Sequence, residues 1–289
     1  MKSKPIILVA GATGNVGGEL VKQLVQHGER VRAMTRRPEA AHVPDGVEVV
    51  RADFDDRASL EAAMVGVDRL FFMSAQPPGS ATVPTHEQVA AACARAAGVR
   101  HIVKLSVLGG GGDDLREPIT RWHHQAEEAI RASGIDCTLL RPGRFMSNAL
   151  QWAPMIRRDG KVRIAFAFRP STPIDPSDVA AVALLALTQP GHASKAYELS
   201  GPELLTPAHE LDILSKLLAR PLELIPLPPE AAREGMLRMG MPEEIVQATL
   251  RRVETSDHGT RIWPTVQQVT GHAPRTFAAW AQAQIDAFR

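Results

Sequence analysis

The sequence contains little of what several functional classes need. Its 289 residues include only two cysteines and one tyrosine, and aromatic residues make up 4% of the chain. Two cysteines cannot form a disulfide framework, and neither belongs to a C-x-x-C pair suited to zinc or redox chemistry. Cys93 and Cys137 both lie in apolar patterns. We therefore interpret them as buried thiols of a protein in the reducing cytoplasm.

The chain also has no excess of charge and no long apolar run. Lys and Arg (33) nearly balance Asp and Glu (32), which argues against a nucleic acid or an anionic membrane as the partner. The apolar stretches, such as 179–187, are too short to span a bilayer, and no signal-peptide pattern opens the chain. The ten histidines form no metal-binding motif. We expect a metal-free protein that acts on a small molecule.

One glycine-containing stretch organises the rest of the chain. The apolar run 6–10 predicts a buried strand, and the apolar spacing over 16–25 predicts a helix. Between them, Gly11, Gly14 and Gly17 form G-x-x-G-x-x-G, a turn that can approach a bulky anion while the first helical amides point at it. A tight turn without a ligand is the alternative. The residues predicted to bind the diphosphate of a dinucleotide are Gly11, Thr13, Gly14, Asn15 and Val16.

Strand and helix patterns then alternate as far as residue 146. Further strands are predicted at 30–35, 47–52, 69–74, 101–106 and 135–140, with helices at 59–64, 85–97 and 118–132. This alternation predicts an α/β fold with a doubly wound parallel sheet of the Rossmann type. We expect a cofactor-binding domain over 1–150 and a smaller, mostly helical lobe over 151–289, of which about 173–200 returns to the sheet. The proline-rich stretch Pro221 to Pro229 is interpreted as a connector.

Residues just after the predicted strands are candidates for binding the cofactor, because ligands of such sheets bind at the carboxyl ends of the strands. Arg36 and Arg37 stand where an acidic residue would favour a free ribose 2′-hydroxyl, so they favour the 2′-phosphate of NADP(H). NAD(H) stays as the alternative, with both arginines solvated at the surface.

Five more positions follow the later strands. We expect Asp53 to accept a hydrogen bond from the adenine amino group and Phe54 to lie beside the ring. Alternatively, Asp53 caps the turn before the helix that follows. The remaining candidates at this edge are Ser74, Ala75 and Gly143.

These segments resemble the NmrA-like, atypical short-chain dehydrogenase/reductase family. The resemblance rests on the motifs G-A-T-G-N-V-G (11–17), T-R-R-P (35–38), V-R-A-D-F (50–54), L-R-P-G (140–143) and Y-E-L-S-G-P (197–202). The family includes NAD(P)H-dependent quinone reductases, a triphenylmethane dye reductase and cofactor-sensing regulators. The resemblance implies NADPH-dependent reduction of a conjugated or quinone-like small molecule. A non-catalytic NADP(H) sensor and a biosynthetic carbonyl or imine reductase are the alternatives, and a homodimer is compatible with each.

The chain departs from the wider superfamily at the catalytic helix. By position, the usual Tyr-x-x-x-Lys pair falls on Ile119 and His123. We predict that His123 acts as an acid/base or orients the substrate, and that Glu127, one turn later, orients the imidazole. Ser106 stands where the superfamily has a serine and is predicted to bind a substrate oxygen. A structural role is the alternative for each of these residues.

Overall fold

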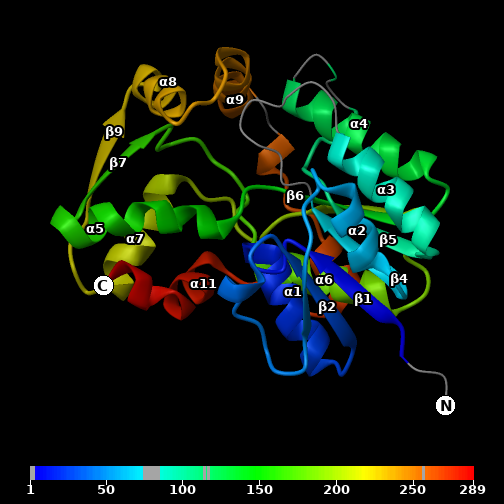
Figure 1. Cartoon of the computed structure of the whole chain (residues 1–289). Helices are drawn as coiled ribbons and strands as arrows, with labels where there is room; N and C mark the ends of the chain where they lie inside the picture. The colour runs from blue at the N-terminus through cyan, green and yellow to red at the C-terminus, as the bar shows by residue number, and fades with distance from the viewer. Residues whose placement is uncertain (1–3, 74–84, 113–114, 116–117, 256–257) are drawn as a thin grey trace.

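A parallel sheet forms the centre of the protein (Figure 1). The computed structural model describes residues 4–73, 85–112, 115, 118–255 and 258–289. Seven strands pair in the order β3-β2-β1-β4-β5-β6-β8, all parallel, which confirms the predicted Rossmann-type fold. Their bounds are β1 (Ile6–Ala10), β2 (Arg30–Thr35), β3 (Glu48–Arg51), β4 (Val67–Met73), β5 (His101–Leu105), β6 (Asp136–Pro142) and β8 (Ala196–Leu199).

Helices cover both faces of this sheet because its strands are apolar on both sides. Ile7, Val9 and Phe71 pack toward one face, whereas Leu8 and Phe72 pack toward the other. The first face is covered by α1 (Asn15–Gln26), α6 (Pro176–Thr188) and α10 (Thr265–Thr270). The second is covered by α2 (Arg57–Met64), α3 (Thr85–Ala97) and α4 (Pro118–Ala132). The second core also holds Cys93 and Cys137, both buried and free.

A third group of buried residues, all from beyond residue 145, forms a core apart from the two faces of the sheet and includes Trp152, Phe277 and Trp280. The other helical elements of this half of the chain are η2 (Met146–Trp152), α5 (Ala153–Asp159), α7 (Pro207–Leu217), α8 (Pro229–Arg238), α9 (Glu243–Thr255), η3 (His258–Thr260), α11 (Phe277–Ala283) and η4 (Ile285–Phe288). None of the helices in the described part of the chain is long and apolar enough to cross a membrane.

The interpretation of 221–229 as a connector is wrong. The stretch contains β9 (Glu223–Leu227), which pairs in parallel with β7 (Lys161–Ala165). Pro226 lies within this strand, opposite Ile164. A proline is tolerated there because each strand of a two-stranded sheet has one free edge, where a missing N–H breaks no ladder hydrogen bond.

Residues 176–199, from the second half of the chain, join the main sheet. The helix α6 packs along α1, and β8 pairs with β6 in the register Leu140 to Tyr197. At the start of α6, the carboxylate of Asp175 accepts from the backbone N–H of Ser177 at 2.8 Å and caps the helix.

Two carboxylates at this end of α6 tie the C-terminal segment to the sheet. The Oδ2 of Asp178 accepts from the backbone N–H of Arg275 at 2.8 Å, and the Arg275 guanidinium pairs with Asp175 at 3.0 Å. Burial raises the pKa of Asp178 to about 6, and the charge of Asp175 adds to the rise.

This raised pKa predicts how stability depends on pH. The folded state binds the Asp178 proton more tightly than the unfolded state does, so its ionisation lowers stability as pH rises from about 4 to above 6. Asp178→Asn keeps an acceptor for Arg275 and carries no charge. We expect the variant to gain about 1–3 kcal/mol over the wild type at pH 8 and almost nothing at pH 4, measured by urea unfolding. An equal gain at both pH values would contradict this account.

Candidate cofactor and active site

The glycine turn between β1 and α1 has a geometry that side chains would obstruct. Gly11 adopts a φ of +70°, in the left-handed region that favours glycine. A methyl group on Gly17 would lie 2.2 Å from the carbonyl oxygen of Gly11. The turn closes through backbone bonds alone, from the N–H of Gly14 to the Gly11 oxygen (2.9 Å) and from the N–H of Gly18 to the Gly14 oxygen (2.8 Å). The helix therefore begins as close to the strand as the backbone allows.

The beginning of α1 fits an anion. Among the residues that the structure describes, no side chain caps this helix at Gly14, and its first turn carries no acidic residue. Side chains cap α2, α6, α7 and α11, whereas α5, α8 and α10 also begin without a side-chain cap. The first amides and the positive end of the helix dipole thus stay available for a phosphate group. Thr13, Gly14 and Asn15 line a cavity of about 510 Å³ that also borders Lys22 of α1 and Asp175 at the start of α6.

The other predicted cofactor residues lie in different surroundings. Val16 is buried in the core, so only its backbone faces the turn. Arg36 and Arg37 are exposed just after β2. Gly143 follows β6, and its N–H donates to the carbonyl of Leu199 at 2.9 Å. Ser74 and Ala75 lie outside the described residues.

The structure bears on both expectations after β3. The Oδ1 of Asp53 accepts from the N–H of Asp55 at 3.2 Å in the turn before α2, which fits its alternative role as the cap of that turn, while Asp56 caps the helix itself. Phe54 is nearly buried, with its ring edge-on to Phe72 at 5.2 Å and stacked on His86 at 5.4 Å. Its ring thus packs into the core around Phe72. Little of the ring is exposed, so the predicted contact with adenine stays a prediction.

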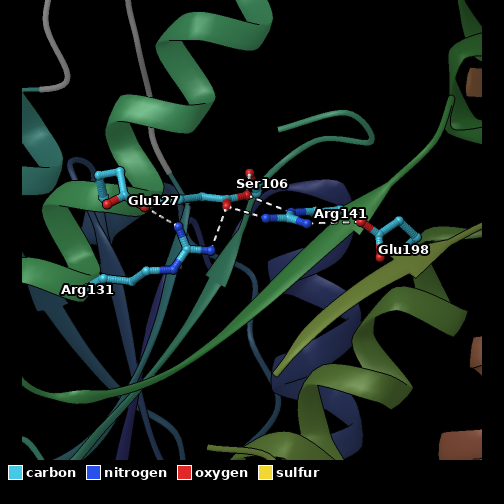
Figure 2. A network of polar contacts seen from close by, with 6 residues as sticks. Ser106, Glu127, Arg131, Arg141 and Glu198 are labelled. Atoms are coloured by element: carbon cyan, nitrogen blue, oxygen red, sulfur yellow. Dashed lines mark hydrogen bonds and ion pairs between the residues drawn. The ribbon is translucent and has the colours of Figure 1, made fainter. Parts of the chain in front are cut away.

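Glu127 makes different contacts from those expected. Its carboxylate is fully buried and accepts from the hydroxyl of Ser106 at 2.7 Å, from Arg141 at 2.9 and 2.6 Å, and from Arg131 at 3.1 Å (Figure 2). Arg141 also donates to Glu198 at 3.0 Å. The structure therefore places Glu127 against β5 and β6 rather than against His123, which lies one turn earlier on the same helix.

Ser106 also bonds to a partner within the protein. It is buried, its hydroxyl donates to Glu127, and a methyl group on Gly110 would lie 2.9 Å from its oxygen. Ser106 is thus covered by the turn that follows β5 rather than open to a substrate. His123 is partly exposed on α4, and its ring meets that of Trp122 edge to face at 4.8 Å.

Sequence reasoning missed Arg141, Lys104 and Glu87 as parts of this region. Lys104 is fully buried on β5 and pairs with Glu87 of α3 at 3.1 Å. Burial lowers the pKa of Lys104, while the charge of Glu87 opposes this shift. For Arg141, the hydrogen bonds and charges of Glu127 and Glu198 outweigh its burial and raise its pKa. For Lys104 and Arg141, the signal in the sequence was a charged residue inside an otherwise apolar strand.

The single tyrosine lies far from the cofactor turn. Tyr197 is on β8, and its hydroxyl lies 2.9 Å from Nδ1 of His192. The carbonyl of His192 accepts from Thr138, whose hydroxyl also contacts His101, the first residue of β5. These contacts place the phenol at the amino edge of the sheet, whereas the glycine turn lies at the carboxyl edge.

This fold and this turn define a dinucleotide-binding protein. The chain belongs to the NAD(P)H-binding family, whose pattern matches residues 11–190. It is 43% identical to (4-alkanoyl-5-oxo-2,5-dihydrofuran-3-yl)methyl phosphate reductase of Streptomyces griseus, over 98% of this chain and 99% of the relative. It is 34% identical to the NAD(P)H azoreductase of Xenophilus azovorans, again over 98% and 99%. The NADPH complex of the Escherichia coli quinone oxidoreductase QOR2 superposes with a TM-score of 0.78, at 26% identity, covering 97% and 98%.

These comparisons confirm the resemblance to the NAD(P)H-dependent reductases and the predicted class of cofactor. They leave the roles of individual residues as predictions.

The exposed arginines after β2 predict the choice between the two cofactors. If they bind the 2′-phosphate, the double variant Arg36→Ala with Arg37→Ala should raise the Kd for NADPH about tenfold or more. The Kd for NADH should stay nearly unchanged, because NADH lacks that phosphate. Titration calorimetry with both nucleotides measures this difference. Arg30→Ala, at the opposite end of the same strand, is the matched control. Equal losses for both nucleotides would remove the arginines from 2′-phosphate recognition.

Proposed function

We propose that the protein reduces a conjugated small molecule with NADPH. The relatives support this proposal, since the names of three of them refer to an acyl-substituted unsaturated lactone, an azo compound and a quinone. In each of these acceptors, a delocalised system can take up the electron pair of a hydride. We infer that the reaction takes place in the cytoplasm, because Cys93 and Cys137 are free thiols.

The position of Tyr197 is the observation that carries this proposal. Reduction of an isolated ketone places charge on a single oxygen and requires a proton donor beside it. The only tyrosine of the chain has its hydroxyl at the amino edge of the sheet, with His192. The hydroxyl of Ser106 is directed to Glu127. A site that lacks both hydroxyl donors suits an acceptor in which the developing charge is delocalised.

The residues of the chain then have separate roles. Bound NADPH supplies the hydride, and a proton from water or a side chain completes the reduction. The uncapped first turn of α1 holds the diphosphate, and Arg36 with Arg37 meets the 2′-phosphate. His123 is partly exposed on α4 and packs against the buried ring of Trp122, and its imidazole orients the acceptor.

The acceptor class can be tested by following NADPH oxidation with quinones, α,β-unsaturated lactones, azo dyes and simple ketones. We expect turnover with the conjugated acceptors and little with the ketones. His123→Ala should lower kcat/KM about tenfold without abolishing turnover, because orientation rather than obligatory protonation is lost. Gln125→Ala, at an exposed position two residues along the helix, is the control.

Two outcomes would contradict the proposal. Turnover confined to simple ketones and abolished by His123→Ala would indicate a carbonyl reductase with an obligatory proton donor. Tight NADPH binding with no turnover of any acceptor would indicate a cofactor sensor.

A further inference from the structure

A fully buried carboxylate lies behind the carboxyl edge of the sheet, and the proposed reaction gives it no role. The carboxylate of Glu127 receives four donor contacts, from Ser106, Arg131 and twice from Arg141 (Figure 2). Oε1 accepts from Ser106 and from Nε of Arg141, and Oε2 accepts from Nη2 of Arg141 and from Arg131. The hydroxyl of Ser106 is the donor in its bond to Glu127, which leaves the oxygen of Ser106 able only to accept.

The turn after β5 rests directly on these side chains. A methyl group on Gly110 would lie 2.9 Å from the Ser106 oxygen and 3.0 Å from Oε1 of Glu127. On Gly111 it would lie 2.8 Å from Nη1 of Arg141. Neither glycine has a positive φ, so the constraint at both positions is space. The polar group formed by Ser106, Glu127 and Arg141 thus determines where the backbone of the turn lies.

At the two flanking glycines, backbone conformation rather than space favours glycine. Gly109 has a φ of +86° and Gly112 a φ of +105°, so these two residues bend the chain at both ends of the turn. The N–H of Leu108 donates to the carbonyl of Pro142 at 2.9 Å, which attaches the turn to the end of β6. On its other side, Gly112 approaches the ring of His124 on α4. The turn therefore spans from β6 to the helix that carries His123.

We propose that Glu127 is a positioning residue of the reductase. Through Ser106 and Arg141 it holds the backbone of residues 109–112 in one position at the sheet edge, and this turn, which reaches α4 at His124, forms one wall of the acceptor site. Ser106 serves the same purpose and is not a proton donor. The inference rests on the proposed function, since it concerns how the acceptor is oriented.

The test compares Glu127→Gln with Glu128→Gln. Glu128 is exposed and pairs with the same Arg131, so its variant controls for the loss of one charge on this helix. We expect Glu127→Gln to lower kcat for a conjugated acceptor about tenfold or more, with the Kd for NADPH within about threefold of the wild type. Glu128→Gln should stay within about twofold. The acceptor KM should change less than kcat, because positioning acts on the reacting geometry.

A second pair of variants disturbs the turn while Glu127 stays intact. Gly110→Ala should produce a similar loss of kcat, because its methyl group displaces the turn from Ser106. Gly235→Ala, at an open position of α8 with an ordinary φ, should have no effect. The double variant with Glu127→Gln and Gly110→Ala should lose little more than either single variant, since both disturb one unit. If Glu127→Gln does not fold, Ser106→Ala and Gly110→Ala still provide the comparison.

The outcomes separate this inference from the proposed function. Wild-type turnover is measured first, and its absence concerns the proposed function alone. With turnover established, activity of Glu127→Gln and Gly110→Ala equal to their controls would overturn the positioning role. The positioning role would also be overturned if the loss of kcat matched the fraction of unfolded protein and NADPH affinity fell by the same factor. A selective loss of kcat in both variants, with both controls unchanged, supports it.

Discussion

The close approach of Gly17 to the carbonyl of Gly11 is the constraint on which the rest of the structure depends. It brings the first turn of α1 against the end of β1 and leaves the helical amides uncapped at the carboxyl edge of the sheet. The helix α6 then packs along α1, and the C-terminal segment is tied to the start of α6 through Asp175 and Asp178. One position without a side chain therefore sets both the phosphate site and the surface on which the C-terminal segment is anchored.

The two edges of the sheet are chemically different. At the amino edge, Tyr197, His192 and Thr138 form neutral hydrogen bonds with one another. At and near the carboxyl edge lie two buried ionic groups, one centred on Glu127 and one joining Lys104 to Glu87. Buried charges of this kind are costly to desolvate and contribute little net stability, but they hold their partners in one geometry. Their position beside the cofactor edge fits a need for a defined arrangement rather than for added stability.

Much of this fold follows from local patterns in the sequence. Apolar or alternating segments between helical patterns predicted the first six strands, and the central ones are apolar because both of their faces are buried. The strand β9 was not predicted, because Pro226 and the prolines around it are typical of loops. Its pairing with β7 is a tertiary contact that these residues do not indicate. The glycine turn could be predicted because strand, turn and helix are consecutive in the chain.

The candidate active site was less predictable, since its residues come from separate elements. The spacing of His123 and Glu127 showed that they share a helix face, but not which strand that face meets. Glu127 meets Arg141, fourteen residues away in the sequence and on a neighbouring element, and this contact depends on the packing of α4 over β5 and β6. Phe54 likewise depends on tertiary packing, because Phe72 and His86 reach it from other elements. The roles of His123 and Ser106 stay predictions for the same reason.

The interleaved connectivity of the two sheets has a consequence for biosynthesis. The strand β7 pairs with β9, while β8, which lies between them in the sequence, joins the edge of the main sheet beside β6. Neither sheet is built from one uninterrupted stretch of chain. During translation, β6 therefore keeps an open edge until residue 199 has emerged, and β7 has no partner until residue 227 has emerged. The nascent protein thus exposes unpaired strand edges late in its synthesis, the state in which chaperones bind and aggregation begins.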